Sequence, residues 1–334
     1  MTRRRISIAF AAGATAVALS VGASPAFAAV DFQNGTWLVG GVNYQFEYDA
    51  NDLSYGGVYH LTTPTQVNYE LGYEEFIFDG GDFSTNSDYA YCLGATATET
   101  TESNGDVVIT CEPYQVDTNS NIWVSHEYRF YNDQMLTRHI LIVENRNTVS
   151  FDLGESYFYY YLNNYDKTAT SSNPASCGTM TADDHWAITA GTSDSMINGY
   201  AWQAAGSTTF TTAGEDCTDD DFSAFLTNAT MAAGEKRIFM SLIASAEPAG
   251  TSTGDMDTAF AAALAQMPSF DSLNDTFCRG LDGLVIDGWG TCAASLPDTG
   301  ASTAVVGSSI AIGSGLLIAG ALALVMARRR QARS

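Results

Sequence analysis

Six glutamates on predicted β-strands could supply the paired carboxylates that cleave glycosidic bonds. Such a pair needs an acid and a carboxylate about 5 to 9.5 Å apart, and the sequence does not show which side chains meet. Alternate strand positions also face solvent, so each glutamate alone indicates a strand surface before it indicates an active site. The GxSxG and HExxH motifs of serine and zinc hydrolases are absent from residues 30–295. The six are Glu47, Glu70, Glu74, Glu75, Glu127 and Glu155.

A histidine and three acidic clusters are further candidates for chemistry. His126 alternates with Val124 and Tyr128 on the apolar side of a predicted strand, which favours a hydrogen-bonded core histidine over a catalytic one. The acidic clusters could bind calcium, but none has the spacing of an EF-hand loop, and turns favour the same residues. We therefore expect no cofactor and no metal, with calcium as the alternative. The clusters are Asp49, Asn51 and Asp52; Asp79, Asp82, Asn86 and Asp88; and Asp216, Asp219, Asp220 and Asp221.

The stretch YFYYYLNNY at residues 157–165 predicts a row of tyrosine rings on one side of a strand. Buried tyrosine hydroxyls need hydrogen-bond partners, so we expect some of these rings to be exposed. Exposed rings beside asparagine side chains could form a flat platform for a glycan. The alternative is a sandwich core with a tyrosine-rich rim. The candidate platform consists of Tyr157, Tyr159, Tyr161, Asn163 and Asn164.

Alternating polar and apolar residues predict that β-strands position these groups. Residues 42–49 alternate strictly, and six further segments show similar strand patterns. The continuous apolar run from Ile140 to Val143 predicts a central strand covered on both faces. Many strands joined by short polar turns are typical of an antiparallel β-sandwich, so the chain is expected to be mainly β. The six segments are 67–78, 106–111, 122–131, 136–144, 150–162 and 236–245.

A short helix is expected near the C-terminal end of the sandwich. Met256, Phe260, Leu264 and Met267 recur with helical spacing on one face, and Pro268 prevents continuation of the helix. We expect this helix to close the sandwich and to be followed by a small disulfide-linked segment.

Six cysteines lie in the part of the chain expected to be exported. An even number in an oxidising compartment predicts three disulfides, although about 15 pairings are open. Pairing of neighbours closes the shortest loops and is our choice: Cys92 with Cys111, Cys177 with Cys217, and Cys278 with Cys292.

The N-terminal end has the order of residues found in secretory signal peptides. Basic residues at 3–5 precede an apolar stretch from Ile6 to Val21 and the small residues Ala28 and Ala29. This pattern predicts cleavage after Ala28 or Ala29. The arginines fit the general export pathway, with the twin-arginine pathway as the alternative.

The C-terminal end predicts a transmembrane helix. Residues 301–327 carry no charge, and the arginines of residues 328–334 follow directly. A helix over Ala304 to Ala327 would be about 36 Å long at about 1.5 Å per residue, enough for a hydrocarbon core of about 30 Å. The positive charges place the C-terminus in the cytoplasm.

The exported part is strongly acidic. Half of the 14 basic residues lie in the two ends and all 38 acidic residues lie between them, so the exported part is more acidic than the whole chain with its net charge of −24. Such a surface repels phosphate backbones, and we expect no nucleic-acid partner.

The segment LPDTG directly precedes the apolar stretch and consists of Leu296, Pro297, Asp298, Thr299 and Gly300. The tag, the apolar span and the arginine tail, in that order, resemble the cell-wall sorting signal of Gram-positive surface proteins. The family pattern is Leu, Pro, any residue, Thr, Gly. This resemblance covers residues 296–334 and implies that a sortase attaches Thr299 covalently to peptidoglycan, while the membrane holds the precursor.

The runs at 127–147, 150–161 and 232–245 are similar in rhythm to sandwich domains of the galactose-mutarotase type, without a catalytic residue that can be transferred. We therefore expect a secreted, wall-anchored surface protein that is structural or binds glycans. The alternative is a secreted carbohydrate-active enzyme of a sandwich fold.

The expected segments are a signal peptide at 1–29, the sandwich at 30–250, a helix and disulfide-linked segment at 251–295, the sorting motif at 296–300, the transmembrane segment at 301–327 and a cytoplasmic tail at 328–334.

Overall fold

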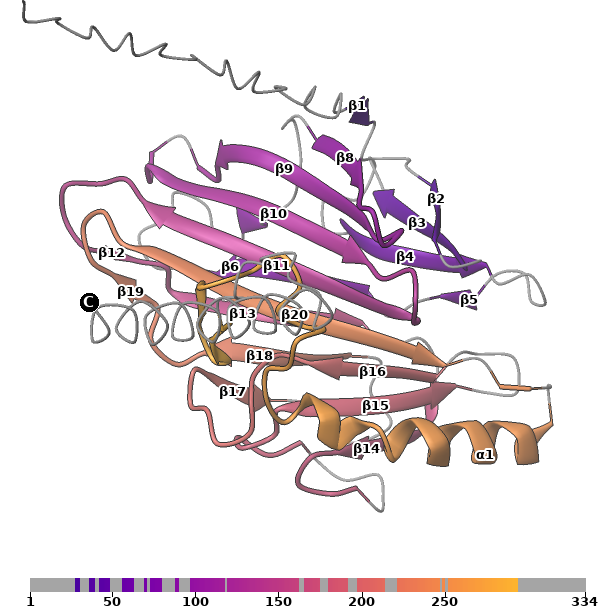
Figure 1. Cartoon of the computed structure of the whole chain (residues 1–334). Coiled ribbons are helices and arrows are strands. Elements are labelled where there is room, and N and C mark those ends of the chain that lie inside the picture. Colours follow the sequence, from indigo (N-terminus) through magenta and orange to yellow (C-terminus); the bar gives the residue numbers. More distant parts are fainter. Residues whose placement is uncertain are drawn as a thin grey trace, which may run out of the picture.

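Antiparallel sheets dominate the described part of the chain in the computed structural model (Figure 1). The signal peptide up to residue 27, the sorting motif and the apolar C-terminal segment lie outside the described residues. The structure describes residues 28–30, 36–39, 42–48, 56–62, 69–70, 73–79, 88–89, 97–117, 119–161, 165–174, 180–191, 197–213, 221–246, 248–249 and 252–293.

The largest sheet has nine strands within the described residues, and its strands run antiparallel in every adjacent pair. In spatial order they are β1 (Ala28–Val30), β8 (Ala97–Thr101), β9 (Val107–Gln115), β10 (Ile122–Phe130), β11 (Leu136–Asn145), β20 (Lys236–Ala246), β16 (Ile197–Ala201), β15 (Trp186–Gly191) and β14 (Tyr165–Thr170).

A five-stranded sheet covers the inner face of the nine-stranded sheet. Its strands in spatial order are β17 (Phe210–Ala213), β18 (Asp221–Leu226), β13 (Glu155–Tyr161), β6 (Tyr73–Asp79) and β7 (Asp88–Tyr89). Buried residues of both sheets share one core, to which Phe76 and Phe158 contribute from one sheet and Leu141 and Phe239 from the other. The expected antiparallel β-sandwich is confirmed.

Smaller strand groups complete the sheet structure. A four-stranded sheet contains β2 (Thr36–Val39), β3 (Val42–Tyr48), β4 (Gly56–Thr62) and β5 (Tyr69–Glu70). Two short pairs are β12 (Phe151–Asp152) with β19 (Thr230–Met231), and β21 (Val285–Ile286) with β22 (Gly290–Thr291).

Strand β11 is buried on both faces, as its apolar run predicts. It lies between β10 and β20, and side chains from alternate positions belong to two different cores. Leu141 and Val143 join the core between the sheets, whereas Ile140 joins a second core on the outer face.

The outer face of the nine-stranded sheet is covered by a helix and the C-terminal segment. Helix α1 (Thr253–Leu264) begins with a capping box between Ser252 and Asp255 and is followed by the 3-10 helix η2 (Met267–Phe270), which starts just before Pro268. Met256 and Met267 are buried against the sheet, which confirms the expected packing face. We call α1, η2 and residues 271–293 the C-terminal cover.

Two backbone carbonyls of β20 hold the far end of the C-terminal cover. The indole Nε1 of Trp289 donates to the Met240 carbonyl at 2.8 Å, and the backbone N–H of Asp287 donates to the Ile238 carbonyl at 2.7 Å. The Cys278–Cys292 disulfide closes this segment and confirms that predicted pairing. Cys111 is also disulfide-bonded, whereas the positions of Cys92, Cys177 and Cys217 lie outside the described residues.

Two predicted strands have different boundaries in the structure. The predicted strand 150–162 is wrong as a single element, because Gly154 has a φ of 71° and separates β12 from β13. The predicted strand 67–78 is likewise divided into β5 and β6. Strand β1 includes Ala28 and Ala29, so cleavage of the signal peptide at the predicted position would remove part of that strand.

Candidate functional site

The predicted tyrosine platform lies on β13 in the five-stranded sheet. Phe158 and Tyr160 point into the core, where Tyr160 donates a hydrogen bond from its hydroxyl to Ser241 Oγ at 3.0 Å. Tyr157 and Tyr159 alternate with them on the outer face and are half-buried.

A ring from the neighbouring strand extends this row. Tyr157 pairs in register with Phe225 of β18, and their ring centroids are 4.9 Å apart. We call Tyr157, Tyr159 and Phe225 the tyrosine face. The Tyr161 side chain, Asn163 and Asn164 lie outside the described part of the chain, so their share in a platform stays a prediction.

The two candidate glutamates with described side chains do not form a catalytic pair. Glu127 lies on the outer face of the nine-stranded sheet, and its Oε1 accepts from Arg138 Nη2 at 2.5 Å. Glu155 shares the outer face of the five-stranded sheet with Tyr157 and is exposed. The two carboxylates therefore lie on opposite outer faces of the sandwich. The side chains of Glu47, Glu70, Glu74 and Glu75 lie outside the described residues.

His126 is a core histidine, as its strand position predicts. Its Nδ1 lies 2.8 Å from His139 Nε2, and its Nε2 lies 3.2 Å from the Tyr114 hydroxyl. Burial, with a smaller contribution from the charge of His139, lowers the pKa of His126 well below its ordinary value. A neutral, fully bonded imidazole fits a structural role between the sheets.

A buried charge network on the outer face was not foreseen from the sequence. Arg129 is 2% exposed and donates from Nη1 to Glu102 at 2.7 Å and to Asp106 at 2.9 Å. Arg279 of the C-terminal cover also donates to Asp106, at 2.8 Å. Burial alone would raise the pKa of Asp106, but hydrogen bonds from Arg279, the Asn132 backbone N–H and Arg129 lower it.

Arg138 links this network to the backbone of the C-terminal cover. Its Nη1 donates to the carbonyl oxygens of Phe277 at 2.6 Å and Arg279 at 2.7 Å, while Nη2 reaches Glu127. The Arg138 side chain is completely buried. The network therefore ties residues 277–279 to the sheet, and the only sequence signal for it was one arginine on each of two predicted strands in an acidic chain.

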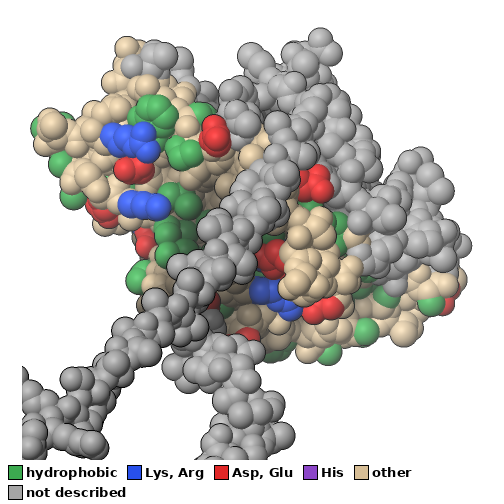
Figure 2. All heavy atoms as spheres, turned by 45° about the horizontal axis from the view of Figure 1, so that its top comes forward, with side chains coloured by type: hydrophobic (Ala, Val, Ile, Leu, Met, Phe, Trp, Pro, Cys, Tyr) green, Lys and Arg blue, Asp and Glu red, His purple; other side chains and the backbone are tan. Residues whose placement is uncertain are grey.

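On the surface, charged side chains form local pairs. Figure 2 shows one face on which basic side chains are few and lie beside acidic ones. Two such pairs lie on the surface of the described part of the chain. Arg146 Nη2 lies 2.7 Å from Glu144, and Lys167 pairs with Asp257 of α1. The second pair adds a contact between β14 and the helix.

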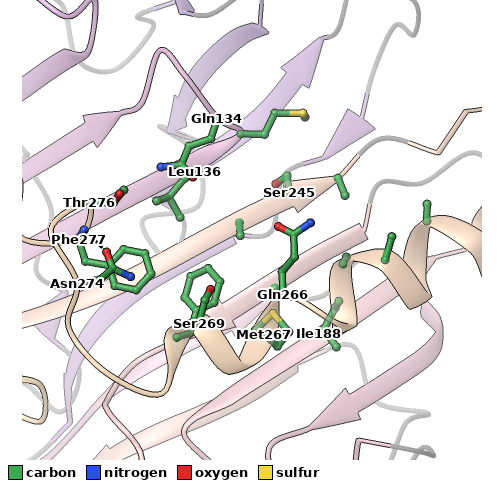
Figure 3. Close-up of a pocket in the computed structure, with 18 residues that line it drawn as sticks. Gln134, Leu136, Ile188, Ser245, Gln266, Met267, Ser269, Asn274, Thr276 and Phe277 are labelled. Atoms are coloured by element: carbon green, nitrogen blue, oxygen red, sulfur yellow. Dashed lines mark hydrogen bonds between the residues drawn. The ribbon is translucent and has the colours of Figure 1, made fainter.

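A cavity of about 440 Å³ lies between the C-terminal cover and the middle strands of the nine-stranded sheet. We call it the helix cavity. Figure 3 shows its side chains converging from β11 and the preceding turn, from η2, and from residues 274–277. None of the described residues that line it carries a charge. Apolar groups include Leu136, Ile188, Met267, Phe270 and Phe277, and polar groups are Gln134, Ser245, Gln266, Ser269, Asn274 and Thr276.

Gly199 of β16 allows η2 to approach the sheet closely at this cavity. A Cβ added at Gly199 would lie 2.7 Å from the sulfur of Met267, so the Met267 side chain would have to move. The absence of a side chain at position 199 therefore seats Met267 at the cavity floor.

The described residues provide no support for a metal site or for a membrane-spanning helix. Within them, no group of three or more His, Cys, Asp or Glu side chains is arranged to hold a metal ion. The acidic clusters considered for calcium lie at positions whose side chains are outside this part, so calcium stays an untested alternative. No helix among the described residues is long and apolar enough to cross a membrane, and residues 301–327 are not among them.

Comparison with known proteins gives no family assignment. No family model matches the chain, and no curated protein matches it by sequence. A galactose mutarotase-like protein from Lactobacillus casei ATCC 334 is similar in structure with a TM-score of 0.41 and 7% identity, covering 64% of this chain and 100% of its own.

Two glycoside hydrolases give comparable values. The GH36 α-galactosidase AgaB from Geobacillus stearothermophilus has a TM-score of 0.37 and 9% identity, covering 70% of this chain and 42% of its own. The galactosidase domain of the α-galactosidase-sucrose kinase AgaSK has a TM-score of 0.38 and 9% identity, covering 66% of this chain and 42% of its own. These similarities are too low to support a statement about the site or the activity.

Proposed function

We propose that the chain is a cell-wall-anchored surface protein, attached to peptidoglycan through Thr299, that binds glycans without cleaving them. The observation that carries the anchoring is the order of four segments: a signal peptide, LPDTG at 296–300, an uncharged span at 301–327 and an arginine tail. Each segment alone is common, but their order serves one purpose. The span holds the precursor at the membrane, where a sortase works, and the arginines stop it from passing through.

The proposed attachment is an acyl transfer. The cysteine thiolate of the sortase attacks the carbonyl carbon of Thr299, and the bond to the Gly300 nitrogen breaks. Gly300 leaves as an amine with the apolar tail. An amine of a peptidoglycan precursor then attacks the thioester, forms an amide with Thr299 and releases the thiolate. Pro297 fixes its own φ and keeps Leu296 out of the helical region, so the tag is presented extended.

Substitution of Thr299 tests this attachment. In cells that produce the full chain, Thr299→Ala should move the protein from the wall fraction that resists hot detergent to the membrane and medium. Thr303→Ala, just beyond the tag, is the matched control and should leave it in the wall. Equal resistance of both variants to hot detergent would refute the proposal.

Under this proposal, the short spacing before the tag would keep the sandwich close to the attachment point. Cys292 is fixed by its disulfide and buried, and only residues 293–295 separate it from Leu296. At about 3.3 to 3.6 Å per residue, the chain from Cys292 to Thr299 spans at most about 25 Å. We expect weak labelling of intact cells by antibodies against the sandwich and strong labelling after wall digestion; equal labelling would contradict this placement.

The tyrosine face is the proposed glycan platform. Tyr157, Tyr159 and Phe225 are adjacent on an outer sheet face, and such rings offer flat apolar surfaces to sugar C–H groups. Binding of the full chain to a glycan array should therefore decrease in Tyr159→Ala and persist in Tyr159→Phe, which keeps the ring. Incubation with each bound glycan would reveal cleavage if the chain were instead a carbohydrate-active enzyme.

A further inference from the structure

We infer that the helix cavity is a second binding site, for a neutral sugar of one or two rings. It lies on the outer face of the nine-stranded sheet, beneath the C-terminal cover. The tyrosine face lies on the outer face of the other sheet, so the two sites can be tested independently.

The first argument is charge. The chain carries 38 acidic residues and a net charge of −24, yet the cavity is lined by described residues without any charged side chain. An ion that entered would lose water without gaining a counter-charge, which is strongly unfavourable. The cavity is therefore suited to uncharged ligands, in contrast to the surface around it.

The second argument is the set of polar groups around the opening. Among the described residues, the side chains of Gln134, Gln266, Ser269 and Thr276 have no hydrogen-bond partner. Asn274 uses its Oδ1 to accept from the Phe277 backbone N–H at 3.0 Å, which leaves its amide N–H groups available. Amides and hydroxyls both donate and accept, which matches the hydroxyl groups of a sugar.

The third argument is the apolar floor. Met267, Phe270 and Phe277 are 2%, 6% and 4% exposed and close the bottom of the cavity. The Phe270 and Phe277 rings are stacked with centroids 5.1 Å apart. A sugar ring has an apolar C–H face and a polar hydroxyl edge, so it can satisfy the floor and the polar groups together.

Peptides and lipid chains fit this arrangement less well. On its sheet side the cavity is lined by residues of β11, β20, β16 and β15, which are neighbours inside the sheet and already paired through their backbones. No strand edge is therefore offered to an extended peptide. A purely apolar chain would remove water from the amides and hydroxyls around the opening without replacing its hydrogen bonds.

The size of the cavity agrees with a small ligand. Its volume of about 440 Å³ lies in the range of about 300 to 1,000 Å³ found for small-molecule pockets. A long oligosaccharide would extend beyond it, and one or two rings would fill it.

Calorimetric titration of the full-length chain in detergent micelles tests the inference. The probes are glucose, galactose, N-acetylglucosamine, maltose and lactose, with glucuronate and glucosamine as charged counterparts of similar shape. At least one neutral sugar should bind, and the charged counterparts should bind at least about tenfold more weakly. Failure of all neutral sugars to bind, or equal binding of the charged ones, would overturn the inference.

Two matched substitutions on α1 locate the site. Ala262 lines the cavity and Ala261 does not, and both are exposed helical positions. Ala262→Phe should weaken sugar binding at least about tenfold by filling the cavity, while Ala261→Phe should change it less than about twofold. Gln266→Ala should weaken it about fivefold through the loss of one hydrogen bond. Equal effects of the two phenylalanine variants would overturn the site.

A variant of the tyrosine face distinguishes binding at that face from binding in the helix cavity. If sugar binding is lost in Tyr159→Ala and retained in Ala262→Phe, the inference is overturned while the proposed glycan platform stands. If it is lost in Ala262→Phe and retained in Tyr159→Ala, the helix cavity is the site for these small sugars.

Discussion

The two faces of the nine-stranded sheet are covered in different ways. On the inner face a second sheet supplies aromatic rings that contact those of the nine-stranded sheet, such as Phe76 and Phe210, whose ring centroids lie 5.6 Å and 5.8 Å from that of Phe239. On the outer face, α1, η2 and the segment up to residue 293 cover the sheet. Ion pairs, a disulfide and Arg138 hold this cover, and a cavity remains beneath it.

The comparison shows how much packing each kind of cover achieves. A sheet extends over many strands and seals the inner face with side chains alone. A helix of 12 residues covers only a part of the outer face, so the remainder depends on specific polar contacts. We therefore expect the inner face to provide most of the stability, while the outer face retains a cavity and the segment that covers it precedes LPDTG in the chain.

The largest effect is expected on the inner face. Phe158→Ala should lower the free energy of unfolding by about 4 kcal/mol, because it removes a fully buried ring and leaves a cavity. Its half-buried neighbour provides the control, since Tyr157→Ala should cost about 1 kcal/mol. Chemical denaturation of both variants would measure the difference, and equal losses would show that the inner face is not the main core.

Loss of Arg138 should release the C-terminal cover. Arg138→Ala leaves Glu127 and two backbone carbonyls without their donor and should cost about 3 kcal/mol. Arg146→Ala removes an exposed ion pair and should cost less than about 1 kcal/mol. Hydrogen exchange should show faster exchange at residues 277–293 in Arg138→Ala; unchanged protection there would contradict the role of Arg138.

Removal of the Cys278–Cys292 disulfide should have a slightly smaller effect. The bond closes a loop with a sequence separation of 14, and loops of this length contribute about 3 kcal/mol in the chain-entropy description, often less in practice. The double variant Cys278→Ser with Cys292→Ser should lower the melting temperature and loosen the cover while β10 and β11 stay protected. A melting temperature equal to wild type would show that backbone contacts such as Trp289 with Met240 suffice.

The smallest effect concerns acidification of the inner face. The pKa of His126 is lowered in the folded state, so near pH 6 the unfolded chain binds a proton that the folded chain does not. The contribution of His126 to the free energy of unfolding should therefore be complete above about pH 6.5. At lower pH the free energy of unfolding should decrease, by at most about 1.4 kcal/mol per pH unit for one proton. Urea titrations between pH 7.5 and 5 would measure this slope, and His126→Asn should reduce it.

The pH range separates this effect from that of the outer face. Arg129 lowers the pKa of Glu102, and hydrogen bonds from Arg279 and Arg129 lower that of Asp106 against the effect of burial, so those carboxylates lose their contribution only as the pH falls below about 4. An unchanged slope above pH 5 in His126→Asn would show that another group causes it.

Strong local patterns allowed much of the fold to be predicted. The alternation around His126 and the apolar run at 140–143 correspond to β10 and β11, and the helical spacing from Met256 to Met267 corresponds to α1 followed by η2. Strands β14 to β18 were not predicted, because residues such as Thr168, Ala169 and Thr170 are small and show no clear contrast between faces. Their positions depend on pairing with distant strands such as β20.

The candidate sites likewise have a part that the sequence predicted and a part that it did not. Alternation predicted which rings of β13 face outward, because that pattern is local. The helix cavity and the contacts of Arg138 join residues from separate strands with residues 266–279, and no local pattern indicates such meetings. Only the tertiary arrangement brings these neutral polar groups together.

The central claim is that the C-terminal cover leads directly into a covalent attachment at Thr299. Mass spectrometry of the C-terminal peptide, released by wall hydrolases and protease from cells that produce the full chain, tests it most directly. The account predicts a peptide that ends at Thr299 and carries a peptidoglycan amine on its carboxyl group. A peptide from the wall fraction that continues through Gly300 into the apolar segment would contradict it.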